Sequence, residues 1–432
     1  MDEKLLRALA LVTRGLACAS VLIAGVATAD PGDLDPSFGN GGKVRTSLSR
    51  YDDSAGRIVV QDDGKIVTVG VGARGGERDL LLARFLPDGD LDTSFGSGGR
   101  VFFGFKKKTE RGAAIALQPD GRIVVTAQVE KGEDTARMLV ARFLVDGSYD
   151  PSFGQKGRVT TAFDGIYLSP AALLVTKTGE ILVGGQGFVG GLTTSKARAW
   201  ILARYDANGR LDRSFGDRGR VVMPLGNGLS ALAEQADGKI VAGGSAGPGF
   251  VDFAVARLLG DGSLDPTFAD GGIAVTSFGS GNDYVEAIAI DGSGRIVAAG
   301  RTWRGVIPDI ALARYLPDGS PDPSFGSGGK VTTDVGHGAN EGYGLLVADD
   351  GRMVVAGWAL VGRRAEFQVV RYLQDGTLDQ SFGDGGVVLT AVGPLGAQAV
   401  DVKLQGADRL IVSGAAVNGK GTSDTALVRY EW

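Results

Sequence analysis

One six-residue motif recurs seven times along this chain, and that recurrence restricts the fold to a repeat architecture. Residues 34–39 read Leu-Asp-Pro-Ser-Phe-Gly. Close variants place a phenylalanine at seven positions separated by 53 to 62 residues: Phe38, Phe95, Phe153, Phe215, Phe268, Phe325 and Phe382. Periods of this size are typical of propellers and solenoids, in which no single unit can bury its own apolar face.

Each repeat contains four short segments with strand character. Residues 113–117 precede Asp120-Gly121, a pair that predicts a two-residue hairpin turn because glycine accepts a positive φ. The next segment, such as 123–125, is continuously apolar, which indicates burial on both faces. A third segment, such as 139–143, leads through the Ser-Phe-Gly motif into a fourth, such as 157–161. Four antiparallel strands per repeat predict a propeller blade.

The two ends of the chain are complementary. After a leader, the chain begins inside a connection between third and fourth strands, at 32–35, and it ends after a third strand, at 427–430. A fourth strand at about 42–47 therefore completes the last blade, and closure removes the exposed sheet edges of an open stack. We predict an all-β, seven-bladed β-propeller as one domain over residues 30–432.

Composition excludes several classes of protein. The 71 glycines among 432 residues lack the three-residue period of collagen, and 43% apolar against 22% charged residues indicates a folded chain. A formal net charge of -5 argues against nucleic-acid binding. The single cysteine and the single histidine exclude disulfides and Cys/His metal sites within the chain.

The N-terminus has the character of a targeting segment. Basic residues up to Arg14 precede an apolar run over 15–27, and Ala-Thr-Ala ends at Ala29. We expect residues 1–29 to be a signal peptide cleaved after Ala29, which gives a secreted or periplasmic protein with no transmembrane segment. A membrane anchor and a lipoprotein signal at Cys18 are the alternatives, but Arg14 shortens the apolar run and most of that run follows Cys18.

Three motifs together resemble the delta-60 repeat family of bacterial β-propeller proteins. They stand here as Leu-Asp-Gln-Ser-Phe-Gly at 378–383, Asp-Gly-Lys-Ile-Val at 237–241 and Ala-Arg-Tyr at 313–315. The resemblance implies a propeller, often in an exported or surface setting, and implies no shared catalytic residues. The chain departs from the pattern at Ala269 and at Ala407-Asp408, which weakens two turns.

Residues that recur in every repeat are expected to serve each blade. This applies to the aspartate of the Leu-Asp motif and to an arginine near the end of each third strand, since a partly buried guanidinium needs a carboxylate or carbonyl partner. The repeated turns are expected to share one face of the ring. The opposite face carries loops that differ between repeats, at 104–111, 187–196 and 301–308.

Function is expected on those variable loops, because loops held by a rigid ring commonly carry binding residues. We predict that Arg301, Trp303, Arg304 and His337 contact a ligand or partner, a protein or a glycan. A rim aromatic without a ligand is the alternative for Trp303. With no second histidine and no nucleophile motif, His337 makes a poor catalytic base.

Carboxylates shortly before the first strands define a second candidate site. Such oxygens at the mouth of the central channel suit Ca²⁺ or Mg²⁺. The candidate ligands are Asp53, Glu110, Asp164, Asp283 and Glu341. The competing interpretation is that they cap turns at a solvated rim.

The predicted function is an exported, non-catalytic binding or scaffold propeller, expected to be a monomer. Two alternatives stay open: a metal-dependent hydrolase or lyase with its site at the channel mouth, and a purely structural component of a surface assembly. No catalytic residue is assigned.

Overall fold

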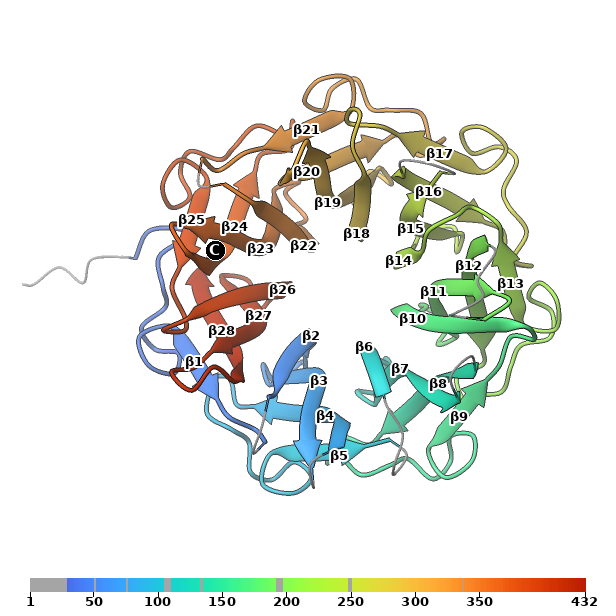
Figure 1. Cartoon of the computed structure of the whole chain (residues 1–432), viewed down its shortest axis with the longest axis horizontal. Coiled ribbons are helices and arrows are strands. Elements are labelled where there is room, and N and C mark those ends of the chain that lie inside the picture. The colour runs from blue at the N-terminus through green and yellow to red at the C-terminus, as the bar shows by residue number, and fades with distance from the viewer. Residues whose placement is uncertain are drawn as a thin grey trace, which may run out of the picture.

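The computed structural model is a closed ring of seven four-stranded antiparallel sheets around a central channel (Figure 1). It describes residues 29–49, 52–74, 77–104, 110–132, 135–191, 197–247, 251–336 and 338–432. Strands and turns make up this part of the chain, which contains no helix. Consequently no helix within it has the length and apolar character needed to cross a membrane.

The blades are numbered 1 to 7 by their innermost strand. The innermost strands are β2 (Ser54–Val60), β6 (Glu110–Leu117), β10 (Ile166–Val175), β14 (Leu229–Glu234), β18 (Asp283–Ile290), β22 (Asn340–Val347) and β26 (Gly396–Leu404). The second strands are β3 (Ile66–Arg74), β7 (Ile123–Gly132), β11 (Ile181–Val189), β15 (Ile240–Ala246), β19 (Ile296–Arg304), β23 (Met353–Val361) and β27 (Arg409–Val417). The third strands are β4 (Glu77–Phe85), β8 (Thr135–Phe143), β12 (Ala197–Tyr205), β16 (Asp252–Leu258), β20 (Ile307–Tyr315), β24 (Arg364–Tyr372) and β28 (Ser423–Glu431). The outermost strands are β5 (Arg100–Phe103), β9 (Arg158–Thr161), β13 (Arg220–Met223), β17 (Ile273–Thr276), β21 (Lys330–Thr333), β25 (Val387–Thr390) and β1 (Lys43–Thr46).

The ring closes through the N-terminal strand. The sheet of blade 7 has the order β1-β28-β27-β26, and Lys43 of β1 faces Val428 of β28. Asp53 fastens this seam, because its carboxylate accepts hydrogen bonds from the backbone N–H of Leu48 and from that of Thr425, at 2.8 and 2.9 Å. The predicted seven-bladed propeller and its mode of closure are confirmed.

The core lies between neighbouring blades. Val125 packs with Leu80 of blade 1, whereas its neighbour Val124 packs with Ile181 of blade 3. Alternate side chains of one strand therefore enter two different interfaces, and both are nearly inaccessible to water. This arrangement explains why the second strands read as continuous apolar runs.

The hairpin after each innermost strand is longer than predicted. Leu117 pairs with Ile123, so residues 118–122 form the connection and the expected two-residue turn is wrong. The N–H of Gln118 donates to the carbonyl of Arg122 at 2.9 Å. Gly121 has φ 80, a conformation that strongly favours glycine. The Asp-Gly pair therefore marked the position of the turn correctly, although the predicted length of the turn was wrong.

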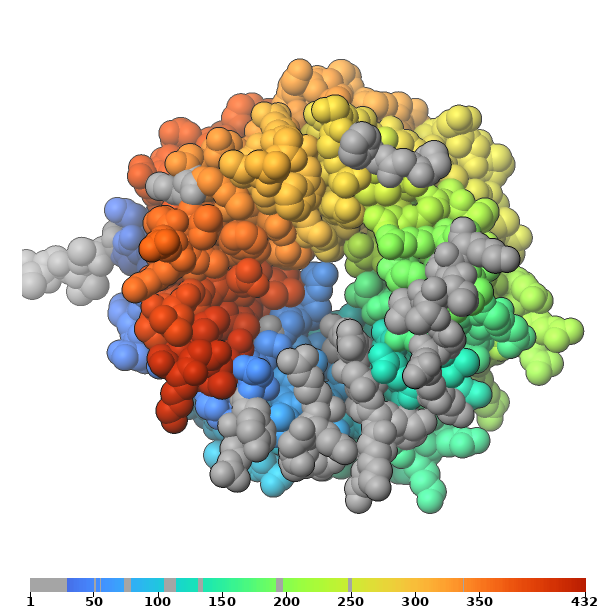
Figure 2. Space-filling view, viewed as in Figure 1, coloured from blue at the N-terminus to red at the C-terminus, as the bar shows by residue number. Residues whose placement is uncertain are grey.

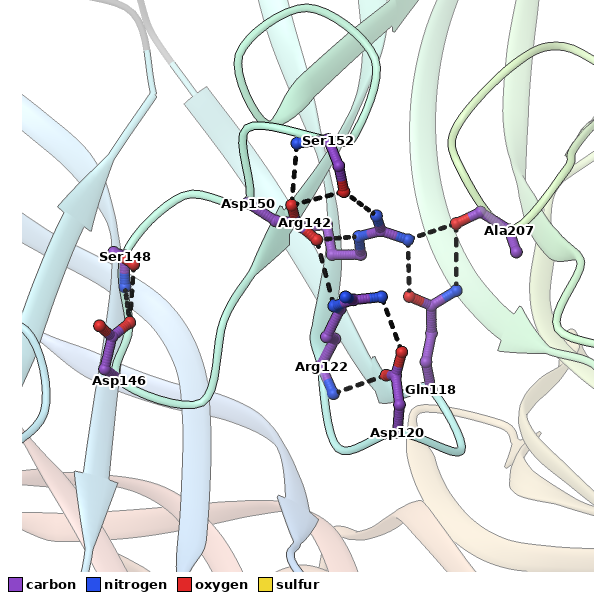
Figure 3. A network of polar contacts seen from close by, with 9 residues as sticks. All are labelled: Gln118, Asp120, Arg122, Arg142, Asp146, Ser148, Asp150, Ser152 and Ala207. Atoms are coloured by element: carbon purple, nitrogen blue, oxygen red, sulfur yellow. Dashed lines mark hydrogen bonds and ion pairs between the residues drawn. The ribbon is translucent and has the colours of Figure 1, made fainter.

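The seven repeated arginines build similar networks on the face that carries these hairpins, and Figure 3 shows the network of Arg142. Arg142 donates through Nε to Asp150 at 2.9 Å and through Nη2 to Ser152 at 2.9 Å, and its guanidinium lies 4.8 Å from the ring centre of Phe153. Its Nη1 donates to the carbonyl of Ala207 in the next blade. The network of Arg142 therefore closes a turn and also ties two blades together. The seven ion pairs are Arg84–Asp92, Arg142–Asp150, Arg204–Asp212, Arg257–Asp265, Arg314–Asp322, Arg371–Asp379 and Arg429–Asp35.

One of the seven networks is incomplete. Six arginines donate through Nη1 to a carbonyl of the following blade, as Arg314 does to Gln374. The Nη1 of Arg371 is buried and has no hydrogen-bond partner among the described residues. Arg371 belongs to blade 6 and faces blade 7, where the two ends of the chain meet, so the missing acceptor coincides with the seam of the ring.

Candidate functional site

All seven innermost strands carry a β-bulge at a similar level of the ring. In blade 5 the register shifts between Val285 and Ala287, which leaves Glu286 as the extra residue. The corresponding shifts occur in the other six innermost strands. A bulge reorients the side chain of the extra residue, and here it delivers residues that differ between repeats to the channel.

Glycine on the second strand makes room for the bulge. A Cβ placed on Gly300 would lie 1.9 Å from the carbonyl oxygen of Tyr284, and one on Gly357 would lie 1.8 Å from that of Glu341. No other residue fits such a close approach of two backbones. The glycine-rich second strands are therefore a local requirement of the bulged innermost strands.

Arg301 follows one of these glycines and points into a polar cluster beside the channel. Its Nη1 lies 2.8 Å from Glu286 Oε1 and 3.2 Å from Glu341 Oε2. Its guanidinium also lies 4.9 Å from the ring centre of Tyr284 and 5.5 Å from that of Tyr343. One cation thus bridges two carboxylates and two aromatic rings of blades 5 and 6.

The electrostatics of this cluster reflect its burial. Burial raises the pKa of Glu286, and the positive charges of Arg301 and Arg57 act against that rise. Burial also raises the pKa of Tyr343, whose hydroxyl donates a hydrogen bond to Glu341. A tyrosine with a raised pKa keeps its proton near neutral pH, so Tyr343 acts as a hydrogen-bond donor to Glu341.

The structure brings together only part of the predicted ligand site. Arg301 lies within β19, so its expected position in a variable loop is wrong. The hairpin pairs as far as Arg304 with Ile307, because no breaker precedes Gly305. Trp303 is half-buried near the end of β19, and Arg304 is exposed, with its Nε 3.9 Å from Asp309 Oδ2. His337 lies outside the described residues.

The candidate metal ligands are engaged separately. Asp53 holds the seam, and Asp283 accepts a hydrogen bond from the N–H of Phe278 at 2.8 Å. Burial raises the pKa of both carboxyls. Glu341 pairs with Arg301, and Asp164 is exposed in the turn before β10.

Glu110 is the first residue of β6, and its side chain is not among those described. Within the described part of the chain, no three His, Cys, Asp or Glu side chains are grouped to hold a metal. The Ca²⁺ or Mg²⁺ site stays a prediction, and the geometry of these carboxylates lends it no support.

Three residues that line or border the channel were missed by sequence reasoning: Arg57, Glu286 and Tyr343. Glu286 of β18 and Tyr343 of β22 are the extra residues of their bulges, and Arg57 of β2 follows Gly56 within the shift between Ala55 and Ile58. The bulges of the other blades have Gly56, Gly112, Ala171, Ser230 and Val400. Comparing the repeats position by position was the signal that could have singled them out.

Seven bulged, four-stranded blades closed by the N-terminal strand define a repeat-built β-propeller. The chain belongs to the family described as "Domain of unknown function (DUF5122) beta-propeller", which confirms the expected kind of repeat. The family model matches six units, at residues 61–95, 118–153, 177–215, 235–268, 292–325 and 348–382. No curated protein sequence matches the chain.

Solved structures with similar folds are distant in sequence. A protein of unknown function from Dyadobacter fermentans DSM 18053 is 14% identical, with 76% of this chain and 96% of that chain covered and a TM-score of 0.46. The polysaccharide lyase Uly1 is 14% identical, with 87% and 89% covered and a TM-score of 0.48. A puromycin hydrolase is 15% identical, with 92% of this chain but 56% of that chain covered and a TM-score of 0.49. At these identities the likeness concerns the fold alone.

Proposed function

We propose that this chain is an exported, non-catalytic binding propeller that contacts a protein partner through its loop face. The loop face is the side that carries the β19–β20 hairpin and the other connections between second and third strands; Figure 2 looks onto it. The turn face is the opposite side, which carries the Asp-Gly hairpins and the seven arginine networks. The observation that carries the proposal is that side chains of the turn face are engaged in bonds within the ring, whereas side chains at the β19–β20 hairpin are exposed.

The turn face uses its recognition groups within the ring. Its arginines are buried and paired with aspartates, as Arg142 is with Asp150. Its serines cap the same aspartates, as when the hydroxyl of Ser152 donates to Asp150 at 2.7 Å. Groups that already hold the blades together have little capacity left for a partner.

The loop face presents apolar and cationic side chains at the tip of the β19–β20 hairpin. Val306 is 85% exposed and Ile307 is 45% exposed, and the neighbouring Arg304 side chain is 59% exposed. Half-buried Trp303 supports the tip from within β19. Protein interfaces are enriched in aromatic residues and arginine, and two adjacent exposed aliphatic side chains favour a protein over a glycan.

The proposal of export rests on the N-terminal sequence, and the residues that follow Ala29 have contacts in the ring. The N–H of Asp30 donates to Asp33 at 3.0 Å, and the carbonyl of Pro31 accepts from Gly383 at 2.9 Å. Residues from Asp30 on therefore take part in the ring. Intact-mass analysis of the protein exported by its source cells should give a chain that begins at Asp30, and a retained Met1 or a lipidated Cys18 would contradict export by this route.

The binding proposal is tested by affinity capture from an envelope extract of the source cells. The loop-face variant carries Arg304→Ser, Val306→Ser and Ile307→Ser, and the matched turn-face control carries Val145→Ser and Leu373→Ser at residues 53% and 40% exposed. We expect the wild-type chain and the control to retain one protein that the loop-face variant loses. Equal retention by the two variants, or loss in the control alone, would contradict the proposal.

A further inference from the structure

The central channel holds a cavity at the level of the seven bulges, and its two sides differ in chemistry. Blades 2 to 4 contribute small side chains, including Ala114, Ala171 and Ser230. The charged groups come from blades 1, 5 and 7: Arg57, Glu286, Asp401 and Lys403. The volume is about 200 Å³, several times the roughly 30 Å³ that one water occupies in the liquid. Figure 2 shows the centre of the ring open on the loop face.

Three of the four charged groups that line this cavity have partners of opposite charge. Lys403 Nζ lies 2.6 Å from Asp401 Oδ1, and Asp401 Oδ2 accepts from the N–H of Ile58 at 3.0 Å. Glu286 is held by Arg301 at 2.8 Å. These pairs fix the lining without using Arg57.

Arg57 is the exception. It extends from blade 1 across the channel, and its Nη2 donates to the backbone carbonyl of Glu286 in blade 5 at 3.4 Å; the strands β2 and β18 face each other across the opening in Figure 1. Within the described residues no carboxylate oxygen lies within 4.0 Å of its guanidinium. A guanidinium that faces a cavity with only one long contact to a carbonyl has donors left for an anion.

The charge balance selects the kind of anion. Glu286 and Asp401 are already paired with Arg301 and Lys403, so Arg57 offers one positive charge, which a monoanion balances and a dianion such as phosphate exceeds. A monocarboxylate matches the planar fork of Arg57 with two parallel hydrogen bonds. The oxygens of Ser230, Glu286 and Asp401 can accept hydrogen bonds from hydroxyl groups on the same molecule.

We propose that the central channel binds a small hydroxylated monocarboxylate, whose carboxylate pairs with Arg57 and whose hydroxyls contact Glu286 and Asp401. The small residues of blades 2 to 4 leave the space that the molecule occupies. This site lies inside the ring and is distinct from the hairpin tip, so the proposal does not depend on the protein partner proposed above.

Calorimetric titration of the full chain with glycerate tests the site. We expect saturable binding of glycerate, weaker binding of propionate, which lacks the hydroxyls, and weaker binding of inorganic phosphate. Arg57→Gln should weaken glycerate binding about tenfold to a hundredfold, as loss of a charged hydrogen-bonded partner does. Arg45→Gln is the matched control, because Arg45 lies on β1, exposed and 3.6 Å from Asp424.

A second variant tests the cavity itself. Ala171 is exposed to the channel, so Ala171→Leu fills the space opposite Arg57 without disturbing a packed interface. It should abolish glycerate binding at an unchanged melting temperature. Absence of saturable glycerate binding, equal binding by Arg57→Gln, or tighter binding of phosphate than of glycerate would overturn the proposal.

Discussion

The two faces of this ring are made from the same seven repeats, yet the turn face keeps nearly the same residues in every blade and the loop face does not. On the turn face every blade repeats the arginine, the aspartate, the phenylalanine and a hydroxyl residue, which is Thr267 in one blade and serine in the others. These residues are constrained because the networks hold the turns and, at six of the seven arginines, join neighbouring blades. On the loop face and at the bulges, equivalent positions hold Gly112, Ser230, Glu286 or Tyr343. Positions that support neighbouring blades are constrained, and positions that face solvent or the channel are free to specialise.

The comparison also explains why Arg142 and Arg301 have different roles, although both are arginines paired with carboxylates. Arg142 is 1% exposed and its partners repeat in every blade, whereas Arg301 is 19% exposed and its partners occur once. The first residue is part of the scaffold. The second is a local feature of blades 5 and 6, next to the channel.

The largest expected effect comes from breaking one turn-face network. Arg142→Ala leaves the buried carboxylate of Asp150 without its principal cation and should lower the free energy of unfolding by about 3–5 kcal/mol. Arg304→Ala on the loop face, where the ion pair is exposed and long, should change it by less than about 0.5 kcal/mol. Urea denaturation of the two variants measures both values, and comparable losses would remove the distinction between the faces.

A smaller loss is expected where the bulge needs glycine. Gly300→Ala places a methyl group against the carbonyl of Tyr284 and should cost about 1–3 kcal/mol through overpacking. Gly292→Ala in the same blade is the control, because a Cβ there meets nothing within 4 Å and its φ is not positive. If Gly300→Ala melts like Gly292→Ala, the bulge does not depend on the close approach of the two strands.

The seam gives a finer test of the turn face. Arg314→Ala removes a guanidinium that also donates to Gln374 of the next blade, whereas the Nη1 of Arg371 has no such acceptor among the described residues. Arg371→Ala should therefore be less destabilising than Arg314→Ala by about 1 kcal/mol, the usual net contribution of one hydrogen bond. Denaturation midpoints of the two variants measure this difference, and an equal or larger loss at Arg371 would contradict the interpretation that its network is incomplete.

The two regions should respond to pH with opposite signs. Hydrogen bonds from Thr267, together with the charge of Arg257, outweigh burial and lower the pKa of Asp265 to about 2. A depressed carboxyl pKa stabilises the fold above pH about 4, the ordinary value of an aspartate, and this contribution is lost as the pH falls toward about 2. Glu286 has a raised pKa because of burial, so acidification from neutral pH relieves the cost of its buried charge.

Urea midpoints measured from neutral pH down to about pH 2 separate these contributions. Asp265→Asn should reduce the loss of stability below pH 4. Glu286→Gln should remove the increase in stability that the wild-type chain gains as the pH falls from neutral. Parallel curves for both variants and the wild-type chain would show that neither carboxyl contributes as described.

The fold was predictable because its determinants are local and repeated seven times. The Asp-Gly pairs, the apolar second strands and the complementary ends each point to closed four-stranded blades, and all three features agree. The two-residue turn was wrong because the Asp-Gly pair marks where the chain reverses but does not fix which residues pair across the hairpin.

The site was predicted only in part, because its contacts join different repeats. Arg301 was selected as a loop residue, yet its partners Glu286 and Glu341 come from two blades whose relative position no spacing in the sequence encodes. The bulge that turns Glu286 toward the channel depends on Gly300 across the sheet. An exposed position such as Val306 could be located in a variable segment, but its exposure follows from where the paired strands end.

Hydrogen exchange of the free and partner-bound chain tests the division between the two faces most directly. The partner is the protein retained by the wild-type chain and lost by the loop-face variant. We predict new protection confined to the β19–β20 hairpin and adjacent loop-face segments, with the Ser-Phe-Gly turns around Phe95, Phe325 and Phe382 already protected in the free chain and unchanged on binding. Protection gained at those turns, with none at the hairpin, would show that the turn face is the binding surface and would contradict the account.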